Sequence, residues 1–428
     1  MIQTISTSNV TSFGGIHLIH QKVRDKNITD FIYGQLGQRA ANSKYSYADL
    51  ILSRCYTALC GGECAEDIDY LKDTFQHLKG LQAASPDTIL NMEQELSTPV
   101  DETTSGSGTT NKVNINEKMN SFLLKMAVYL NVLTPSQKDY CLDFDHQFIP
   151  TEKHDATYSY KHKKGYFPAV ASIDNTPVYI ENRNGNCSVK FNQLETLKRV
   201  FAQLDDNGIH PARCLMDCGS YIKEVCDWLS SEQSSCRFYI RAENSHQLIT
   251  KAAENKHWQD IQIAEQHYQT SSIEYRFGQH THRVVCYRQP NKTGQSSVES
   301  GDSYNYHFII TNDRQWADKQ IIEYYNGRGN SERLFDIQNN DFNWKRMPAS
   351  FLEYNTVYLT IMAACHVLYK WLIDNFSKAC SVVRNKDRLK KFIFRLVSIP
   401  AKVTHSGRRQ VVKLFTNLPI HRLGDRSP

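Results

Sequence analysis

Apolar residues recur at helical spacing through the first hundred residues of the chain. Ser46 and Asp49 form a predicted capping box, and the helix that follows them is predicted to end at Gly61. A second helix is predicted to begin at Ser85, where a capping serine precedes a proline in the first turn. Two short helices around a turn are typical of a DNA-reading unit, although ordinary helical packing produces the same pattern. The pattern therefore predicts a helical N-terminal domain over residues 1–100, with DNA binding as its functional interpretation.

The stretch from Asp101 to Asn111 contains no apolar residue. Such a stretch predicts an exposed linker or loop, and we place the first domain boundary at a linker over 101–112. Beyond it, apolar residues recur at helical spacing between Ile115 and Leu130. A long amphipathic helix is therefore predicted to lead into the next domain.

From Tyr140 onward the period changes to that of strands, with Leu142 and Phe144 alternating with polar residues. Two further strand-like runs flank the turn Asp174-Asn175 and predict a hairpin. The remaining predicted elements are a helix over 194–204, a strand over 213–216 and a helix over 221–229. This order is typical of an α/β fold in which strands from three places share one sheet. We expect residues 113–377 to form this core.

Two later segments have their own patterns. Residues from about 254 to 312 alternate in the manner of strands around a polar loop, and they predict a β-rich insertion in the core. The run from Thr356 to Ile373 is apolar enough to approach membrane length, but His366 and Lys370 interrupt it. A buried helix packed behind the active centre is the better interpretation, and no membrane is expected as a partner.

Composition changes this picture only in part. The 428 residues, 40% hydrophobic and 22% charged, describe a globular protein of two to three domains with a net charge of +5. The segment 378–428 holds thirteen Lys or Arg against two acids, with phenylalanines between them, which suits a polyanion. A solvated or partly disordered tail is the alternative. The twelve cysteines form no C-x-x-C pair, so a zinc knuckle is not expected, and the polar start predicts no secretion leader.

Three carboxylates lie where a metal-dependent nuclease centre needs them. Two divalent cations about 3.5 to 4 Å apart serve phosphodiester cleavage, and Mg²⁺ takes oxygen ligands from separate elements. Asp145 lies on a predicted strand, Asp217 follows another, and Glu332 begins a late helix. A carboxylate in or just after an apolar strand is costly to bury unless it is paired or metal-bound. Asp143 lies on the same side as Asp145 and is an alternative ligand, and a pair that only flanks a sheet edge is a further alternative. Asp217 has an alternative role in forming a turn.

Tyr325, Arg328 and Glu332 have a spacing that places them on one face of a helix. There the Arg and the phenol would reach phosphate oxygens of the strand that the metal site cleaves. A solvated helix end is the alternative, because Gly327 and Gly329 are poor helix formers that leave helix only from about residue 330.

These blocks together resemble the three motifs of DDE transposases encoded by bacterial insertion sequences, in particular the insertion-sequence 1380 group of the insertion-sequence 4 superfamily. The motifs are Leu-Asp-Phe-Asp at 142–145, Met-Asp-Cys-Gly-Ser-Tyr at 216–221 and Tyr-x-x-Arg-x-x-x-Glu at 325–332. Supporting strings are Pro-Thr-Glu-Lys-His-Asp-Ala at 150–156, Gly-Tyr-Phe-Pro at 165–168 and Tyr-Ile-Glu-Asn-Arg-Asn-Gly-Asn at 179–186. The similarity extends from residue 13 almost to the C-terminus.

The resemblance implies an RNase H-like catalytic core with a β-rich insertion between the second Asp and the Glu. It implies Asp145, Asp217 and Glu332 as catalytic acids and metal ligands, with Tyr325 and Arg328 on DNA phosphate. The implied activity is cleavage of transposon ends and their joining to target DNA with Mg²⁺ or Mn²⁺, through two ions. The implied partners are double-stranded DNA and a second copy of the chain on paired ends, in the bacterial cytoplasm at the nucleoid.

One departure from the family pattern concerns a basic residue. Related proteins often carry a Lys seven residues beyond the Glu, where this chain has Asn339; Arg333 or Lys345 is a candidate substitute.

Three alternative functions follow from the same residues. A nuclease that cuts without joining shares the chemistry, and a transposase-derived DNA-binding protein would keep the fold without activity. A glycosidase would need only two carboxylates and neither a third acid nor a basic segment, so it is the weakest alternative.

Overall fold

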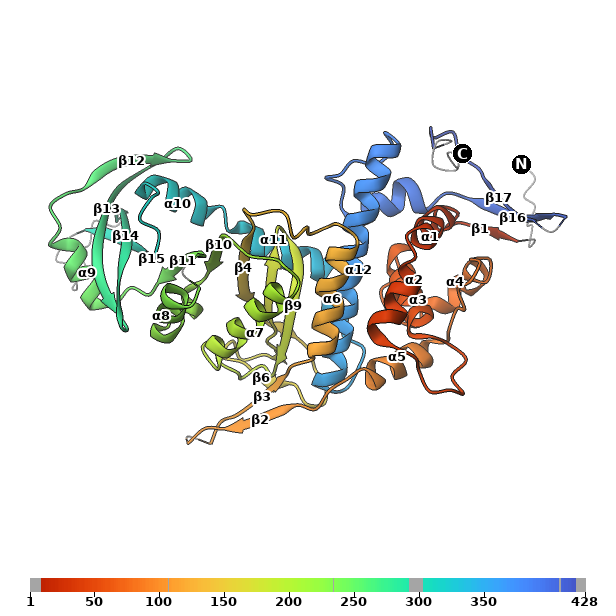
Figure 1. Cartoon of the computed structure of the whole chain (residues 1–428), viewed down its shortest axis with the longest axis horizontal. Helices are drawn as coiled ribbons and strands as arrows, with labels where there is room; N and C mark the ends of the chain where they lie inside the picture. The colour runs from red at the N-terminus through yellow and green to blue at the C-terminus, as the bar shows by residue number, and fades with distance from the viewer. Residues whose placement is uncertain (1–8, 107, 234, 292–302, 408, 421–428) are drawn as a thin grey trace.

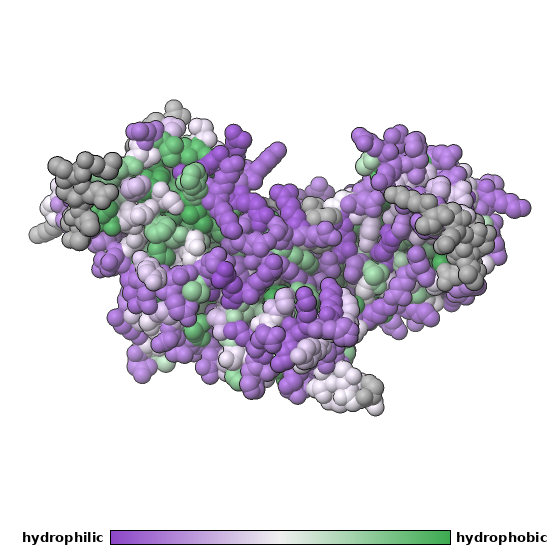
Figure 2. Space-filling view, turned by 180° about the vertical axis from the view of Figure 1, so that it is seen from behind, coloured by the Kyte–Doolittle hydropathy of each residue, from purple (hydrophilic) through white to green (hydrophobic). Residues whose placement is uncertain are grey.

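The computed structural model describes residues 9–106, 108–233, 235–291, 303–407 and 409–420. The molecule is elongated, with the N-terminal helices at one end, a β-rich region at the other and a sheet between them (Figure 1). Seen from behind, hydrophilic residues cover most of the middle of the molecule (Figure 2). Hydrophobic residues gather toward the left of that view, the end that carries the N-terminal helices.

The N-terminal region is helical, as its apolar period predicts. Its helices are α1 (Gly15–Asp25), α2 (Ile28–Leu36), α3 (Tyr47–Leu59), α4 (Ile68–Phe75) and α5 (Pro86–Glu95). The predicted capping box is confirmed, because the Ser46 side chain accepts from the Asp49 amide while the Asp49 carboxylate accepts from the Ser46 amide. Ser85 likewise caps α5, with Pro86 in its first turn.

The predicted linker over 101–112 is wrong as secondary structure. This segment forms a hairpin of β2 (Asp101–Thr104) and β3 (Thr110–Asn114), and β3 pairs with β9 (Thr176–Arg183) at the edge of the main sheet. All four β2 residues are exposed, so polar composition correctly predicted solvent exposure but could not show that backbone pairing to β3 would order the segment. The amphipathic helix expected after it is α6 (Glu117–Tyr129).

Five strands form the centre of the main sheet in the order β9-β8-β4-β10-β11. The strands are β4 (Cys141–His146), β8 (Ala169–Ile173), β9, β10 (Arg213–Met216) and β11 (Arg237–Ala242). β4 runs parallel to β10 and β10 parallel to β11, whereas β8 is antiparallel to both β4 and β9. The predicted hairpin turn is confirmed: Asp174 and Asn175 both have positive φ, as a two-residue type I′ turn requires. The crossover helices are α7 (Gln193–Asp206) and α8 (Lys223–Ser231).

The strands expected between about 254 and 312 extend the same sheet. After α9 (His246–Ala253) come β12 (Gln259–Ile263), β13 (Gln266–Phe277), β14 (His280–Pro290) and β15 (Tyr304–Thr311). β15 pairs antiparallel with β11, so these strands continue the central sheet instead of forming a separate one. A smaller sheet contains β5 (Ile149–Pro150), β6 (Thr157–Tyr158) and β7 (Lys164–Tyr166).

The last third of the chain contributes elements to both ends of the molecule. Its helices are α10 (Asp318–Asn326), α11 (Gly329–Asn340), α12 (Leu352–Ala379) and α13 (Leu389–Phe392). Among the described residues, α12 is the one helix long and apolar enough to cross a membrane, and 89% of its most apolar window is buried inside the protein. The prediction of a buried helix is therefore confirmed. The helix contacts α6, β9, α3 and α5, so the sheet and the N-terminal helices share it.

The C-terminal basic segment is ordered over much of its length. A π-helical turn over Ile393–Val397 leads into β16 (Ala401–Ser406) and β17 (Arg409–Leu414), and β1 (Val10–Thr11) pairs with β16. Within residues 378–407 and 409–420 the backbone thus forms helical turns and paired strands, whereas many side chains are exposed, as the alternative of a solvated tail expects. The two ends of the described chain meet in one small sheet.

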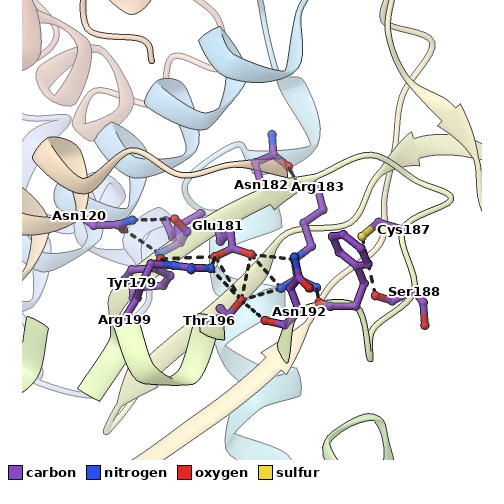
Figure 3. A network of polar contacts seen from close by, with 12 residues as sticks. Asn120, Tyr179, Glu181, Asn182, Arg183, Cys187, Ser188, Asn192, Thr196 and Arg199 are labelled. Atoms are coloured by element: carbon purple, nitrogen blue, oxygen red, sulfur yellow. Dashed lines mark hydrogen bonds and ion pairs between the residues drawn. The ribbon is translucent and has the colours of Figure 1, made fainter. Parts of the chain in front are cut away.

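A buried ionic network fixes β9 against α7 (Figure 3). The Glu181 carboxylate accepts from Arg183 Nε and Nη2, at 3.1 and 2.8 Å, and from Arg199 at 2.7 Å. Thr196 donates a further hydrogen bond to it at 3.0 Å. Burial raises the pKa of Glu181, but the charges of Arg183 and Arg199 outweigh burial and lower it. The motif string at 179–186 thus supplies structure to the sheet that carries the candidate acids, on a strand that β8 separates from β4.

Candidate active site

Two candidate acids lie side by side because two strands run parallel. Phe144 on β4 is the register partner of Met216 on β10, and the next residues along these strands are Asp145 and Asp217. Adjacent strands are about 4.8 Å apart, and register partners share a face of the sheet. Both carboxylates therefore emerge together at the carboxyl ends of the central strands, each of them half-buried. The strand register thus places these two acids at neighbouring positions, and their role as metal ligands stays a prediction.

Arg328 joins the acids of β4. Its Nε lies 3.3 Å from Asp143 Oδ1, and a terminal guanidinium nitrogen lies 2.8 Å from Asp145 Oδ2. The three side chains are only 14%, 11% and 20% exposed, so these contacts are shielded from solvent. A planar guanidinium can hold two carboxylates at once, which a lysine cannot do with the same geometry.

The electrostatics of the site couple all three aspartates to this one cation. Burial raises the pKa of Asp143 to about 7, the Arg328 guanidinium opposes that shift, and the negative charges of Asp145 and Asp217 add to it. Burial lowers the pKa of Arg328, but the charges of Asp145 and Asp143 outweigh burial and raise it. Arg328 therefore stays charged and offsets the repulsion among the acids.

Tyr325 is a buried residue in this structure. Its hydroxyl donates to the carbonyl oxygen of Met216 at 3.2 Å, and burial raises the pKa of the phenol to about 12. The contact fixes the end of α10 over the end of β10, directly beside Asp217. Tyr325 thus helps to place Arg328, and its contact with DNA phosphate stays a prediction.

Glu332 stands apart from the aspartates in its environment. It lies in the first turn of α11 and is exposed. The prediction of one helix face through Tyr325, Arg328 and Glu332 is wrong, because α10 ends at Asn326 and α11 begins at Gly329. The two glycines that flank Arg328 explain the break, since glycine costs about 1 kcal/mol relative to alanine inside a helix.

Carboxylate oxygens are the donors that Mg²⁺ and Mn²⁺ prefer, so the chemistry of Asp145 and Asp217 fits such an ion. Across the part of the chain that the structure describes, however, no three His, Cys, Asp or Glu side chains lie close enough together to hold a metal. Metal binding by Asp145, Asp217 and Glu332 therefore stays a prediction.

A cavity of about 360 Å³ opens beside Asp143, between α10 and the sheet. Its lining includes the acids Asp174 and Glu323 as well as Asp143, so it is unsuited to a phosphate group. Sequence reasoning missed these two acids as neighbours of the site. No local pattern marks them, because one lies in the hairpin turn and the other on α10.

The residues considered for the missing basic partner differ in exposure. Asn339 is buried in α11, whereas Arg333 on the same helix and Lys345 beyond it are exposed. A charged lysine at Asn339 would need a buried counter-charge. Arg333 and Lys345 stay the candidates for this role.

No curated protein matches the chain. A cryo-EM structure of a piggyBac transposase synaptic complex with hairpin DNA is similar at a TM-score of 0.42 and 12% identity, covering 92% of this chain and 82% of that one. The family model described as transposase DDE domain group 1 matches residues 4–425. The chain therefore belongs to this family of DDE transposases.

Proposed function

We propose that the chain is the transposase of a bacterial insertion sequence of the insertion-sequence 1380 group. It binds the terminal inverted repeats of its element as double-stranded DNA, cleaves the ends and joins them to target DNA. It acts in the cytoplasm at the nucleoid, as a homodimer on paired ends. The single observation that carries this proposal is the pairing of Asp145 and Asp217 at the ends of adjacent parallel strands, with Arg328 beside them.

The strand order supports an RNase H-like core. Three strands, β9, β8 and β4, follow one another as an antiparallel meander, and β10 and β11 continue parallel to β4. The β12–β15 insertion then falls between Asp217 and Glu332, in the order that the family implies.

Each residue has a defined part in the proposed chemistry. Asp145, Asp217 and Glu332 would hold the divalent cations, which supply an activated nucleophile and stabilise the leaving oxygen of the phosphodiester. Arg328 would contact phosphate and balance negative charge as DNA enters. Asp143 would hold the Arg328 guanidinium in place, so we assign it as a positioning residue and Asp145 as the first ligand.

Substitution of the acids tests the catalytic assignment. We expect Asp145→Ala, Asp217→Ala and Glu332→Ala each to reduce Mg²⁺-dependent cleavage of inverted-repeat DNA at least about a hundredfold, while DNA affinity stays near wild type. The measurement is single-turnover cleavage on a gel beside a binding titration. Asp206→Ala, an exposed acid on α7, is the matched control and should cleave normally.

The outcomes separate the alternative functions. Full cleavage by all three variants would remove the catalytic assignment. Cleavage by the wild type without strand transfer to a target plasmid would indicate a nuclease that does not join. Binding of the repeats without cleavage in Mg²⁺ or Mn²⁺ would indicate a DNA-binding protein derived from a transposase.

A further inference from the structure

The β16–β17 hairpin is a two-faced ribbon. Its register pairs Lys402 with Lys413 and Ser406 with Arg409. Because register partners share a face and side chains alternate along a strand, Lys402, Arg409 and Lys413 all lie on one face. The ribbon lies at the end of the molecule beside β1 (Figure 1).

The opposite face is anchored to the protein. Ala401 and Val403 are buried, and an added Cβ on Gly14 would lie 2.5 Å from the Ala401 Cβ. The Gly14 amide also donates to the Ile399 carbonyl at 2.7 Å. Gln410, near the tip, donates to the carbonyl of His77 at 2.9 Å. The ribbon is therefore fixed on the N-terminal helices with its basic face directed away from them.

The positive charges on the basic face repel one another, and no described residue of the protein neutralises them. Like charges directly opposite each other on paired strands are destabilising, and Lys402 and Lys413 are such a pair. None of the three cations forms an ion pair with a described residue. Other cations of the same basic segment do, since Arg388 pairs with Asp336 and Asp341, and Lys391 and Arg395 pair with Asp387.

The spacing of the cations matches duplex DNA. Arg409 and Lys413 are four residues apart on one strand, which is about 13 Å at the rise of a β-strand. A DNA groove is about 6 to 12 Å wide, so cations at the two ends of the ribbon can reach phosphates on both of its sides. Phosphate contacts of this kind position a protein on DNA without reading its sequence.

We propose that the outer face of the β16–β17 ribbon, formed by Lys402, Arg409 and Lys413, binds the phosphate backbone of double-stranded DNA. It forms a contact separate from the acidic site and holds the duplex at the N-terminal end of the molecule. The proposal deepens the proposed function and rests on it only for the identity of the DNA as the element's own end.

The test compares two triple variants of the full-length protein. In K402Q/R409Q/K413Q, we expect affinity for a 30-base-pair inverted-repeat duplex to fall at least about tenfold at 0.1 M NaCl. The slope of log K against log salt should become shallower by about 2 to 3, as three lost phosphate contacts require. Fluorescence anisotropy over a salt series measures both quantities.

The control K72Q/K198Q/K319Q removes the same charge from sites on α4, α7 and α10. Each of these lysines already has an acid partner, Asp69, Glu195 or Glu323 respectively. Wild-type affinity and salt slope in the control support the proposal. Equal losses in both variants would show an effect of net charge alone and overturn it, as would no loss in the ribbon variant.

Two further measurements keep the result specific. The melting temperature of the ribbon variant should equal or exceed that of the wild type, because the Lys402–Lys413 repulsion is removed; a large decrease would overturn the charge assignment. Single-stranded RNA and anionic vesicles serve as competing probes. If the ribbon variant loses affinity for either of them and not for duplex DNA, the proposal is also overturned. Cleavage that does not depend on Asp145, Asp217 or Glu332 would contradict the proposed function, but the DNA-binding result for the ribbon would still hold.

Discussion

At the scale of single residues, the centre of the molecule depends on one guanidinium among three aspartates. Asp143 and Asp145 contact Arg328 directly, and Asp217 acts on it through space. In the sequence, the alternation of side chains along β4 predicts that Asp143 and Asp145 lie on one face. It does not show which of the two is the metal ligand. The structure distinguishes them by burial, since Asp143 is the more enclosed and lies farther from the strand end.

Arg328→Lys tests the two-carboxylate contact. Lysine keeps the charge but cannot hold Asp143 and Asp145 at once, so we expect cleavage to fall about a hundredfold with DNA affinity within a few-fold of wild type. Single-turnover rates measure the effect. Arg314→Lys, at an exposed pair with Glu274, is the control and should leave the rate unchanged.

Asp143→Asn separates positioning from metal binding. The amide keeps the shape but weakens the hold on Arg328, so cleavage should fall by about tenfold, less than in Asp145→Ala. Because Asp143 is assigned no ligand role, the Mn²⁺ concentration that gives half-maximal cleavage should stay unchanged. A strong shift of that concentration would make Asp143 the ligand.

At the scale of elements, local patterns correctly predicted the helices, strands and turns whose sequence contains signals for where they begin and end. The Ser46 cap, the Asp174-Asn175 turn and the strand over 213–216 all appear where expected. The segments whose predicted structure was wrong lack such signals or contain conflicting ones. The 101–112 segment forms a hairpin in which β2 pairs with β3, and β3 pairs in turn with β9, which lies about 70 positions farther along the chain.

Glu181→Gln tests the network that holds β9 to α7. It leaves the buried Arg183 and the half-buried Arg199 without their counter-charge, so we expect a loss of about 3 to 5 kcal/mol in the free energy of unfolding at pH 7. The folded-state pKa of Glu181 is lowered, so its contribution is present above the ordinary carboxyl value and is lost as pH falls through the folded pKa. The gap between wild type and variant should therefore narrow in acid.

Urea unfolding at pH 7 and in acid measures that gap. Glu195→Gln, from a solvent-exposed pair with Lys198, should change stability by no more than about 0.5 kcal/mol at either pH. A Glu181→Gln protein as stable as the wild type at pH 7 would show that the network is not structural.

At the scale of the whole molecule, the two ends of the described chain form one unit. β1 pairs with β16, and a Cβ on Gly15 would lie 1.8 Å from the carbonyl oxygen of Leu396. The helical N-terminal region therefore packs against residues near position 400. A division of the chain into separate domains at 100 and 378 does not describe this contact.

Gly15→Ala tests this dependence. The methyl group has no room against Leu396, so we expect a loss of about 1 to 3 kcal/mol and a lower melting temperature. Gly34→Ala, in the exposed part of α2 with no atom within 4 Å of the added Cβ, should be neutral or stabilising by up to about 1 kcal/mol. Equal melting temperatures for the two variants would contradict close docking of α1 on the C-terminal segment.

The sequence by itself determined the chemistry and the local elements: which carboxylates follow apolar strands, where helices are capped, and which family the motifs resemble. Periodicity and capping act over a few residues, so they can be read without a fold. Only the tertiary structure decided that Asp145 and Asp217 lie at neighbouring positions of adjacent strands, that Arg328 contacts Asp143, that Tyr325 is buried, and that the basic segment forms a ribbon on the N-terminal helices. These are contacts between distant residues, fixed by strand register and by burial, and no local pattern encodes them.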